Sequence, residues 1–206
     1  MVPIDTKEKL IAIAVERFLA LGPDGVSLRA IAKRAGITPM AVYRHYDDKE
    51  ALLLAVIERG FASYASYLDV GVPAADPVDH LKWLAGRVFD FAHEQGAYFE
   101  LMFLTARTAR GLSDRIRITS IHAPTYRVAR EALRDAGYRE VTCGGTLKAA
   151  TTDMLAYCIG FCAFFISGAL PVEADEARAR FLQGFSRLLV RLLNTDARSV
   201  SEGDRQ

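Results

Sequence analysis

The stretch Gly36-Ile-Thr-Pro-Met-Ala-Val-Tyr-Arg-His-Tyr46 places four large side chains next to one another at its end. A helix turns by about 100° per residue, so four consecutive side chains cannot all face one core. The spacing places Val42 and Tyr46 inward. It leaves three side chains for the outer surface: Tyr43, Arg44 and His45.

Two short helices are predicted around this stretch. Ser27 is a good N-cap for the first, whose apolar side chains face inward, and Gly36 ends it. Thr38 and Pro39 are typical of the start of the second, as cap and first helical residue. Two such helices joined by a turn are the pattern of a helix-turn-helix. The second helix is about nine residues long, so it depends on packing for its stability.

Positive charge is concentrated in the same region. Residues 27–46 contain no acidic side chain and four basic ones, Arg29, Lys33, Arg34 and Arg44, although the formal net charge of the chain is only +1. Local positive charge is what a phosphate-facing surface needs, because neutralised phosphates release counterions. Arginine can also read guanine in the major groove, and Met40 and Ala41 can contact thymine methyl groups. The alternative is a solvated basic helix pair without a partner.

The run from Leu10 to Leu53 resembles the DNA-binding domain of the tetracycline-repressor-like (TetR) family of transcriptional regulators. The resemblance rests on its glycine spacing, on Tyr43-Arg-His-Tyr46 and on Lys49-Glu-Ala-Leu52. It implies a dimeric regulator, most simply a repressor, that binds a double-stranded DNA operator and a small-molecule effector. Charge and resemblance together predict a DNA-binding face made of Ser27, Arg29, Lys33, Thr38, Met40, Ala41, Tyr43, Arg44, His45 and Lys49.

The whole chain has the pattern of an all-α protein. Of its 206 residues, 51% are hydrophobic and 25% charged, as in globular domains. Apolar residues recur every three to four positions, which predicts further helices over residues 77–94, 97–108, 113–136, 146–169 and 174–193, with Pro124 kinking or splitting one of them. We expect a helix-turn-helix domain over residues 1–48, a ligand-binding and dimerisation domain over 49–195, and a disordered tail over 196–206.

Residues 154–172 carry no charge over 19 positions, which approaches the length of a membrane-spanning helix. Pro171 ends this run early, so a buried helix of the protein or of a dimer interface is the preferred interpretation. The N-terminus lacks the apolar stretch of a signal peptide, and three cysteines form no even disulfide framework. We therefore expect a cytoplasmic protein with reduced thiols and no membrane contact.

Two stripes at 4-3-4 spacing predict a homodimer interface of four helices. The first is a seam of small residues, Ala156, Gly160, Ala163 and Ser167. The second is a stripe of large residues on the last helix, Phe181, Phe185, Leu188 and Leu192. The alternative is that both stripes belong to the core of one chain.

Aromatic and soft side chains on the central helices predict a cavity for a lipophilic or aromatic effector. The candidates are Trp83, Phe89, Phe99, Met102, Phe103, His122, Tyr126, Cys158, Phe161 and Phe165. The helix from Asp48 to Leu68 would move as a rigid body when the cavity fills. Most of these side chains also suit an ordinary core, so a ligand-independent DNA-organising or protein-interaction module is the alternative.

Catalysis has no positive support in the sequence. There is no nucleophile motif, phosphate loop or pair of carboxylates, so we expect neither enzyme activity nor a cofactor. Cys158 and Cys162 are four residues apart, but no histidine or acid accompanies them. They are expected to be buried thiols and not metal ligands.

Overall fold

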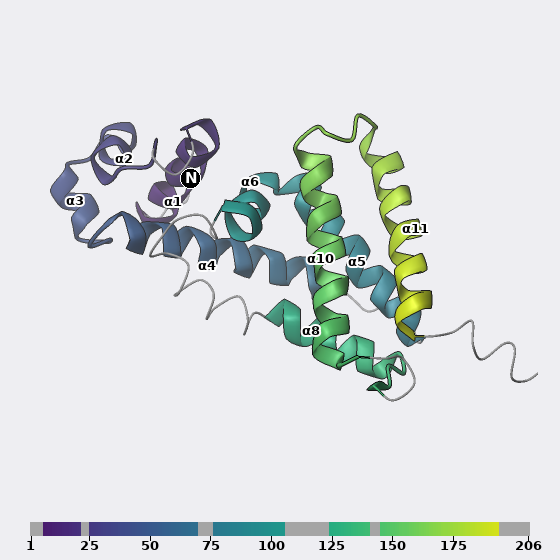
Figure 1. Ribbon diagram of the computed structural model, residues 1–206. Coiled ribbons are helices and arrows are strands. Elements are labelled where there is room, and N and C mark those ends of the chain that lie inside the picture. Colours follow the sequence, from purple (N-terminus) through teal and green to yellow (C-terminus); the bar gives the residue numbers. More distant parts are fainter. Residues whose placement is uncertain (1–5, 22–24, 70–75, 106–123, 141–144, 194–206) are drawn as a thin grey trace, which may run out of the picture. The chain divides into compact units, whose positions relative to one another are not determined.

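The structure, a computed structural model, describes residues 6–21, 25–69, 76–105, 124–140 and 145–193. All regular secondary structure in these residues is helical, which confirms the all-α prediction (Figure 1). The helices are α1 (Thr6–Leu21), α2 (Leu28–Ala35), α3 (Pro39–Tyr43), α4 (Lys49–Leu68), α5 (Pro77–Glu94), α6 (Gly96–Phe99), the π-helix η2 (Glu100–Thr105), α8 (Pro124–Asp135), α10 (Leu147–Ile166) and α11 (Ala174–Leu193). Parts of two predicted helices, over 106–108 and 113–123, and the predicted tail lie outside the described residues.

The chain divides into two compact units within α4. The first unit contains α1, α2, α3, α4 as far as Ser63, α6 and η2. The second contains α4 from Tyr64 onward, α5, α8, α10 and α11. The predicted boundary after residue 48 lies at the start of α4 and stays a prediction, whereas the division into units falls after Ser63.

The core of the first unit consists of apolar side chains that recur every three to four residues along its helices. Its fully buried members include Leu10, Ile31, Val42, Leu52 and Val56. η2 packs against α4, where the rings of Phe61 and Phe103 meet edge to face with centroids 6.1 Å apart. Gly60 permits this close packing, because a Cβ there would lie 2.5 Å from the sulfur of Met102.

In the second unit α5, α8, α10 and α11 pack around an aromatic core. Phe89 of α5 and Phe181 of α11 are fully buried, with ring centroids 5.6 Å apart. Burying a phenylalanine side chain stabilises a fold by about 2 kcal/mol. The Tyr157 hydroxyl of α10 donates to the backbone carbonyl of Phe181 at 2.8 Å, which ties α10 to α11. Gly184 leaves the room for this tyrosine, since a Cβ there would overlap its hydroxyl.

Local signals in the sequence explain where α8 and α10 begin. α8 starts at Pro124, a position where proline is tolerated because the first turn of a helix needs no N–H donor. α10 starts after Thr146, whose hydroxyl accepts from the backbone N–H of Ala149 at 3.2 Å. The Glu140 carboxylate accepts from the N–H of Leu147 at 2.9 Å, so a second orphan donor of the first turn is satisfied.

Candidate DNA-binding face and ligand cavity

Both helices of the helix-turn-helix begin at side-chain caps. The Ser27 hydroxyl accepts from the N–H of Ala30, and the Thr38 hydroxyl accepts from the N–H of Ala41, each at 3.2 Å. Gly36 has a φ of 72°, in the left-handed region that favours glycine. The angle at which α3 leaves α2 is therefore determined locally, by the caps and by this glycine.

The side chains at the end of α3 divide as predicted. Val42 and Tyr46 are buried, with 0% and 6% of their surface exposed. Tyr43, Arg44 and His45 are exposed. The inward pair holds the short helix against its neighbours, and three consecutive side chains with hydrogen-bonding groups remain open to solvent.

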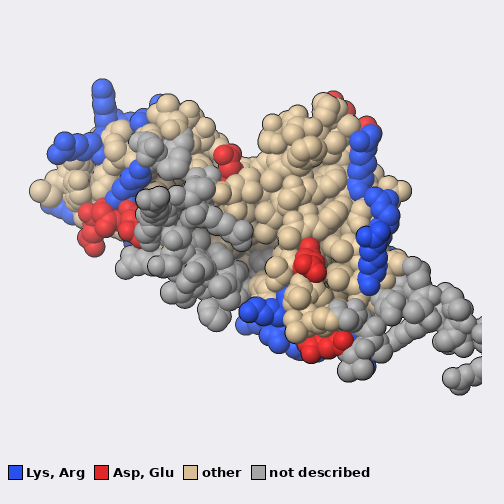
Figure 2. Space-filling model, viewed as in Figure 1, with Lys and Arg blue, Asp and Glu red and all other residues tan. Residues whose placement is uncertain are grey.

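The other residues of the predicted DNA-binding face are also accessible. Ser27, Arg29, Lys33, Thr38 and Met40 are exposed, and Ala41 and Lys49 are half-buried. Met40 is 68% exposed, the largest exposure among the large hydrophobic side chains that the structure describes. Figure 2 shows basic side chains over the part of the first unit that contains α2 and α3. The face thus combines positive charge with an exposed apolar side chain.

Arg34, which contributes to the local charge in the sequence, has a structural partner. Its guanidinium forms a bidentate ion pair with the Glu16 carboxylate of α1. On the same pair of helices, Lys9 of α1 donates to the backbone carbonyl of Ala35, at the end of α2, at 2.8 Å. These two contacts hold α2 on α1. The charge of Arg34 is neutralised by Glu16, so Arg34 contributes to packing and adds no net positive charge to the domain.

A cavity of about 30 Å³ lies in the second unit. Its walls include Tyr64 and Leu68 of α4, Leu84 and Val88 of α5, Ala129 of α8, and Met154 and Cys158 of α10. No charged side chain lines it. Pockets for small molecules typically measure about 300–1,000 Å³. A ligand that enters here must therefore be apolar and must displace at least one wall.

The predicted lining residues are spread more widely than this cavity. Only Cys158 among them belongs to its walls. Phe99, Met102 and Phe103 lie in the first unit and do not line this cavity. Three of the other candidates pack on aromatic rings: Phe89 and Phe161 on Phe181, and Phe165 on Phe89. Trp83 lies beside His80, and the Tyr126 hydroxyl reaches the backbone of α10. His122 is outside the described residues. Of the aromatic candidates, Phe89 and Phe99 are buried in the core, and aliphatic side chains line most of the cavity.

Two cysteines of α10 are free thiols inside the protein. Burial raises the pKa of the Cys158 thiol well above its ordinary value, and it raises the pKa of Cys162 from 9.0 to about 12. Burial thus favours the protonated form of both thiols at neutral pH.

α10 is unusually apolar for a helix with so much exposed surface. In the small-residue seam, Ala156, Gly160 and Ser167 are exposed and Ala163 is half-buried. Phe164, on the same side, is 55% exposed. By length and composition α10 is the one described helix that could cross a membrane. Core helices of soluble proteins, which are mostly buried, pass the same test, whereas 28% of the apolar window of α10 is buried. Contiguous exposed apolar surface of this kind typically marks an interaction site.

The prediction that the α11 stripe forms a dimer interface is wrong for two of its four residues. Phe181 and Phe185 are 0% and 1% exposed, because the stripe faces the core of its own chain. Leu188 and Leu192 are half-buried. The exposed side of α11 instead carries a line of basic side chains, visible in Figure 2: Arg180, Arg187 and Arg191.

Known proteins resemble this chain in two ways. Residues 10–56 match the family described as bacterial regulatory proteins, tetR family. The HTH-type transcriptional activator FasR of Mycolicibacterium smegmatis is 24% identical over 181 residues, which are 84% of this chain and 78% of FasR. The HTH-type transcriptional regulator SrpR of Pseudomonas putida is 40% identical over 53 residues, which are 26% of this chain and 25% of SrpR.

Solved structures share the fold over nearly the whole length. The fatty acid degradation regulator FadR from Bacillus halodurans has a TM-score of 0.73 at 14% identity, with 90% of this chain and 96% of that chain covered. A TetR-like transcriptional regulator from Rhodococcus sp. RHA1 has a TM-score of 0.70 at 18% identity, with 92% and 99% covered. At these identities the likeness concerns the fold.

Proposed function

We propose that this chain, whose residues 10–56 match the tetR family and whose fold is shared with TetR-like regulators, is a homodimeric transcriptional repressor released from its operator by an apolar effector. The observation that carries this proposal is the joint presence of an exposed basic helix-turn-helix and a small apolar cavity, with one helix contributing to both units. Its site of action is the cytoplasm, where operator DNA is found.

The predicted DNA-binding face supports the operator half of the proposal. Tyr43, Arg44 and His45 are exposed at the end of α3. The side-chain caps of α2 and α3 fix where these two helices begin and so position the three side chains. Arginine and lysine contribute affinity through the phosphates, and Met40 offers an apolar contact for a thymine methyl group. One such face makes too few contacts for useful specificity, so two copies read two half-sites.

α10 supports the dimer. Its small-residue seam and Phe164 form an exposed apolar side, and small residues allow a second helix to approach closely. A second copy of the chain supplies the covering surface. The exposed side of α11 carries arginines, and like charges that face each other across a two-fold axis repel, so α10 is the better centre for the interface.

The cavity supports control by an effector. Tyr64 and Leu68, which belong to its walls, occupy the last turns of α4, the helix that begins beside the DNA-binding face at Lys49. A ligand that enlarges the cavity must act on these side chains, and it shifts the protein toward the state in which it binds more tightly.

The effector is tested by release from DNA. Fragments retained from a random pool by the purified protein provide the DNA, and a panel of aliphatic and aromatic compounds is screened for loss of retention. We expect release by members of this panel, and no release from the variant Ala129→Met, whose longer side chain fills the cavity. Ala179→Met, on the exposed side of α11, is the matched control.

Two results would contradict the effector half of the proposal. One is that no apolar compound changes DNA binding; the other is that Ala129→Met responds as the wild type does. The relative FasR is described as an activator. A compound that strengthens DNA binding would replace release by the effector with ligand-dependent binding and keep the cavity as the regulatory site.

A further inference from the structure

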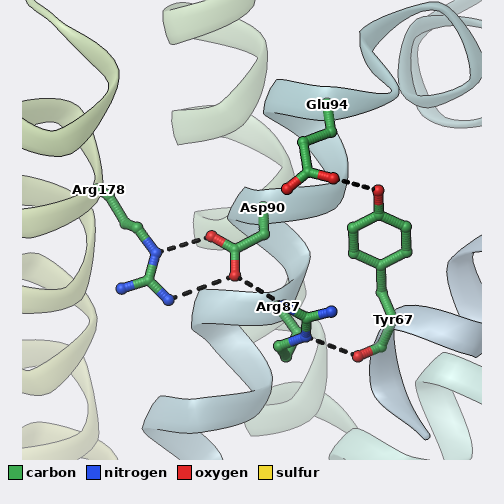
Figure 3. A network of polar contacts seen from close by, with 5 residues as sticks. All are labelled: Tyr67, Arg87, Asp90, Glu94 and Arg178. Atoms are coloured by element: carbon green, nitrogen blue, oxygen red, sulfur yellow. Dashed lines mark hydrogen bonds and ion pairs between the residues drawn. The ribbon is translucent and has the colours of Figure 1, made fainter. Parts of the chain in front are cut away.

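A network of polar contacts joins three helices of the second unit beside the cavity (Figure 3). We call it the Asp90 network; its members are Tyr67 of α4, Arg87, Asp90 and Glu94 of α5, and Arg178 of α11. At its centre the Asp90 carboxylate accepts from Nε of Arg178 at 2.7 Å and from Nη1 of Arg87 at 3.1 Å. The side chain of Asp90 is only 18% exposed, so these ion pairs are partly shielded from water.

Arg87 extends the network to the end of α4. Its Nε donates to the backbone carbonyl of Tyr67 at 2.8 Å, and its guanidinium carbon lies 5.0 Å from the centre of the Tyr67 ring. α4 ends at Leu68, so this carbonyl is one of the last four, which have no intrahelical donor. A cation at this end is also favoured by the helix dipole. Arg87 is therefore a C-terminal cap supplied by another helix.

The remaining contacts of the network involve Tyr67, in the last turn of α4, and Arg178 of α11. The Tyr67 hydroxyl donates to the Glu94 carboxylate at 2.6 Å, which holds the tyrosine side chain along α5. On the other side of Asp90, the helix at Gly86 has no side chain in the way of Arg178, because a Cβ there would lie 2.8 Å from its Nη2. α5 thus leaves room for Arg87 and Arg178, the two arginines that pair with the Asp90 carboxylate.

We propose that Asp90 is a positioning residue for operator binding: it orients Arg87 on the end of α4 and ties that turn to α11. The inference rests on the proposed function and concerns its regulation. No member of the Asp90 network belongs to the predicted DNA-binding face, and none lines the cavity. The network acts by restraining the turn that also contains Leu68, a wall of the cavity.

In the structure the Asp90 network is formed, so Arg87 holds the end of α4. Without the Asp90 carboxylate, Arg87 loses the partner that orients it, and the last turn of α4 gains conformational freedom that DNA binding must remove again. An effector that presses on Tyr64 and Leu68 works against the same restraint.

The test uses the full-length protein and two measurements. Asp90→Asn keeps the size of the side chain and removes its charge, and Arg87→Gln removes the cap. We expect the backbone amides of residues 65–69 to exchange about 3- to 10-fold faster in both variants. We expect a similar loss of affinity for a DNA fragment selected by the wild type, measured at constant salt. Asp90→Glu, which keeps the carboxylate, restores most of both.

A matched control lies on the same helix. Asp79 and Lys82 of α5 form an exposed ion pair at 2.8 Å, so Asp79→Asn removes an equivalent charge without touching α4. It should leave amide exchange and DNA affinity unchanged. If Asp90→Asn does not fold, Arg178→Gln, with a 41% exposed side chain, replaces it.

The outcomes separate this inference from the proposed function. If the amides of residues 65–69 exchange in Asp90→Asn and Arg87→Gln as fast as in the wild type, the network does not restrain the end of α4. Faster exchange with unchanged DNA affinity leaves a merely structural ion pair and overturns the positioning role. If the wild type selects no DNA at all, the proposed function fails, and the positioning role fails with it.

Discussion

At the scale of residues, arginines of one small domain have different tasks. Arg34 is bound to Glu16 of α1 and holds two helices together. Arg44, at the end of α3, is exposed next to Tyr43 and His45. The difference is set by the acid on α1, which lies 18 residues before Arg34 in the sequence. Charge counted along a short window cannot separate the two roles.

This difference predicts the effects of two matched substitutions. Arg44→Ala should weaken binding to the selected DNA by about 10-fold or more and reduce its salt dependence, with little change in the melting temperature. Arg34→Ala should change DNA affinity by less than about 3-fold and lower stability by up to about 1 kcal/mol, the usual range of an exposed ion pair. A salt-controlled binding titration and a thermal melt measure both. Equal affinity losses would place both arginines on the DNA.

The buried thiols predict a loss of stability at high pH. Since the pKa of Cys162 is about 12 in the folded protein and 9.0 ordinarily, the unfolded chain releases its proton first. The contribution is complete below pH 9 and falls by about 1.4 kcal/mol per pH unit between these values. Urea unfolding at pH 8 and pH 10.5 should show this decrease, and Cys162→Ala should reduce it. An identical decrease in both proteins would contradict the shifted pKa.

At the scale of elements, α10 and α11 show what periodicity can and cannot determine. The 4-3-4 stripes predict correctly which residues share a side of each helix. They do not show whether that side faces its own chain or another. On α10 the small residues remain exposed, whereas on α11 the phenylalanines enter the core. A stripe of large residues suits a core as well as an interface, and only packing separates them.

The exposed side of α10 predicts a substitution that breaks the proposed dimer. Phe164→Glu places a charge in the proposed interface and should shift the protein toward monomers by about 10-fold or more in dissociation constant. Leu19→Glu is the control, because Leu19 is 51% exposed in the first unit. Sedimentation equilibrium of both variants measures the effect. A Phe164→Glu protein that dimerises as the wild type does would exclude this side of α10.

Two glycines of the same helix pair predict opposite effects on stability. Gly184→Ala should destabilise the fold by about 1–3 kcal/mol, because its Cβ would overlap the Tyr157 hydroxyl. At Gly160 a Cβ meets nothing within 4 Å, so Gly160→Ala should stabilise the isolated chain by up to about 1 kcal/mol. Unfolding in urea compares them. Equal effects would argue against the described packing of Tyr157.

At the scale of the whole molecule, the sequence predicts the helix-turn-helix better than the cavity. Caps, turn glycine and inward residues of the helix-turn-helix follow from local rules and appear in the structure. The cavity depends on how several helices pack, and its aliphatic walls are indistinguishable from core in the sequence. The pairing of Asp90 with Arg178 spans 88 residues, so no spacing could have predicted it.

The most direct test of the central claim is native mass spectrometry of the protein on DNA that it selects from a random pool. Two identical faces in a symmetric dimer predict an inverted repeat, with half-sites about one helical turn or a multiple of it apart. The complex should contain the chain in pairs on each site. A single chain on an asymmetric site, or a pool in which no sequence is enriched, would contradict the account.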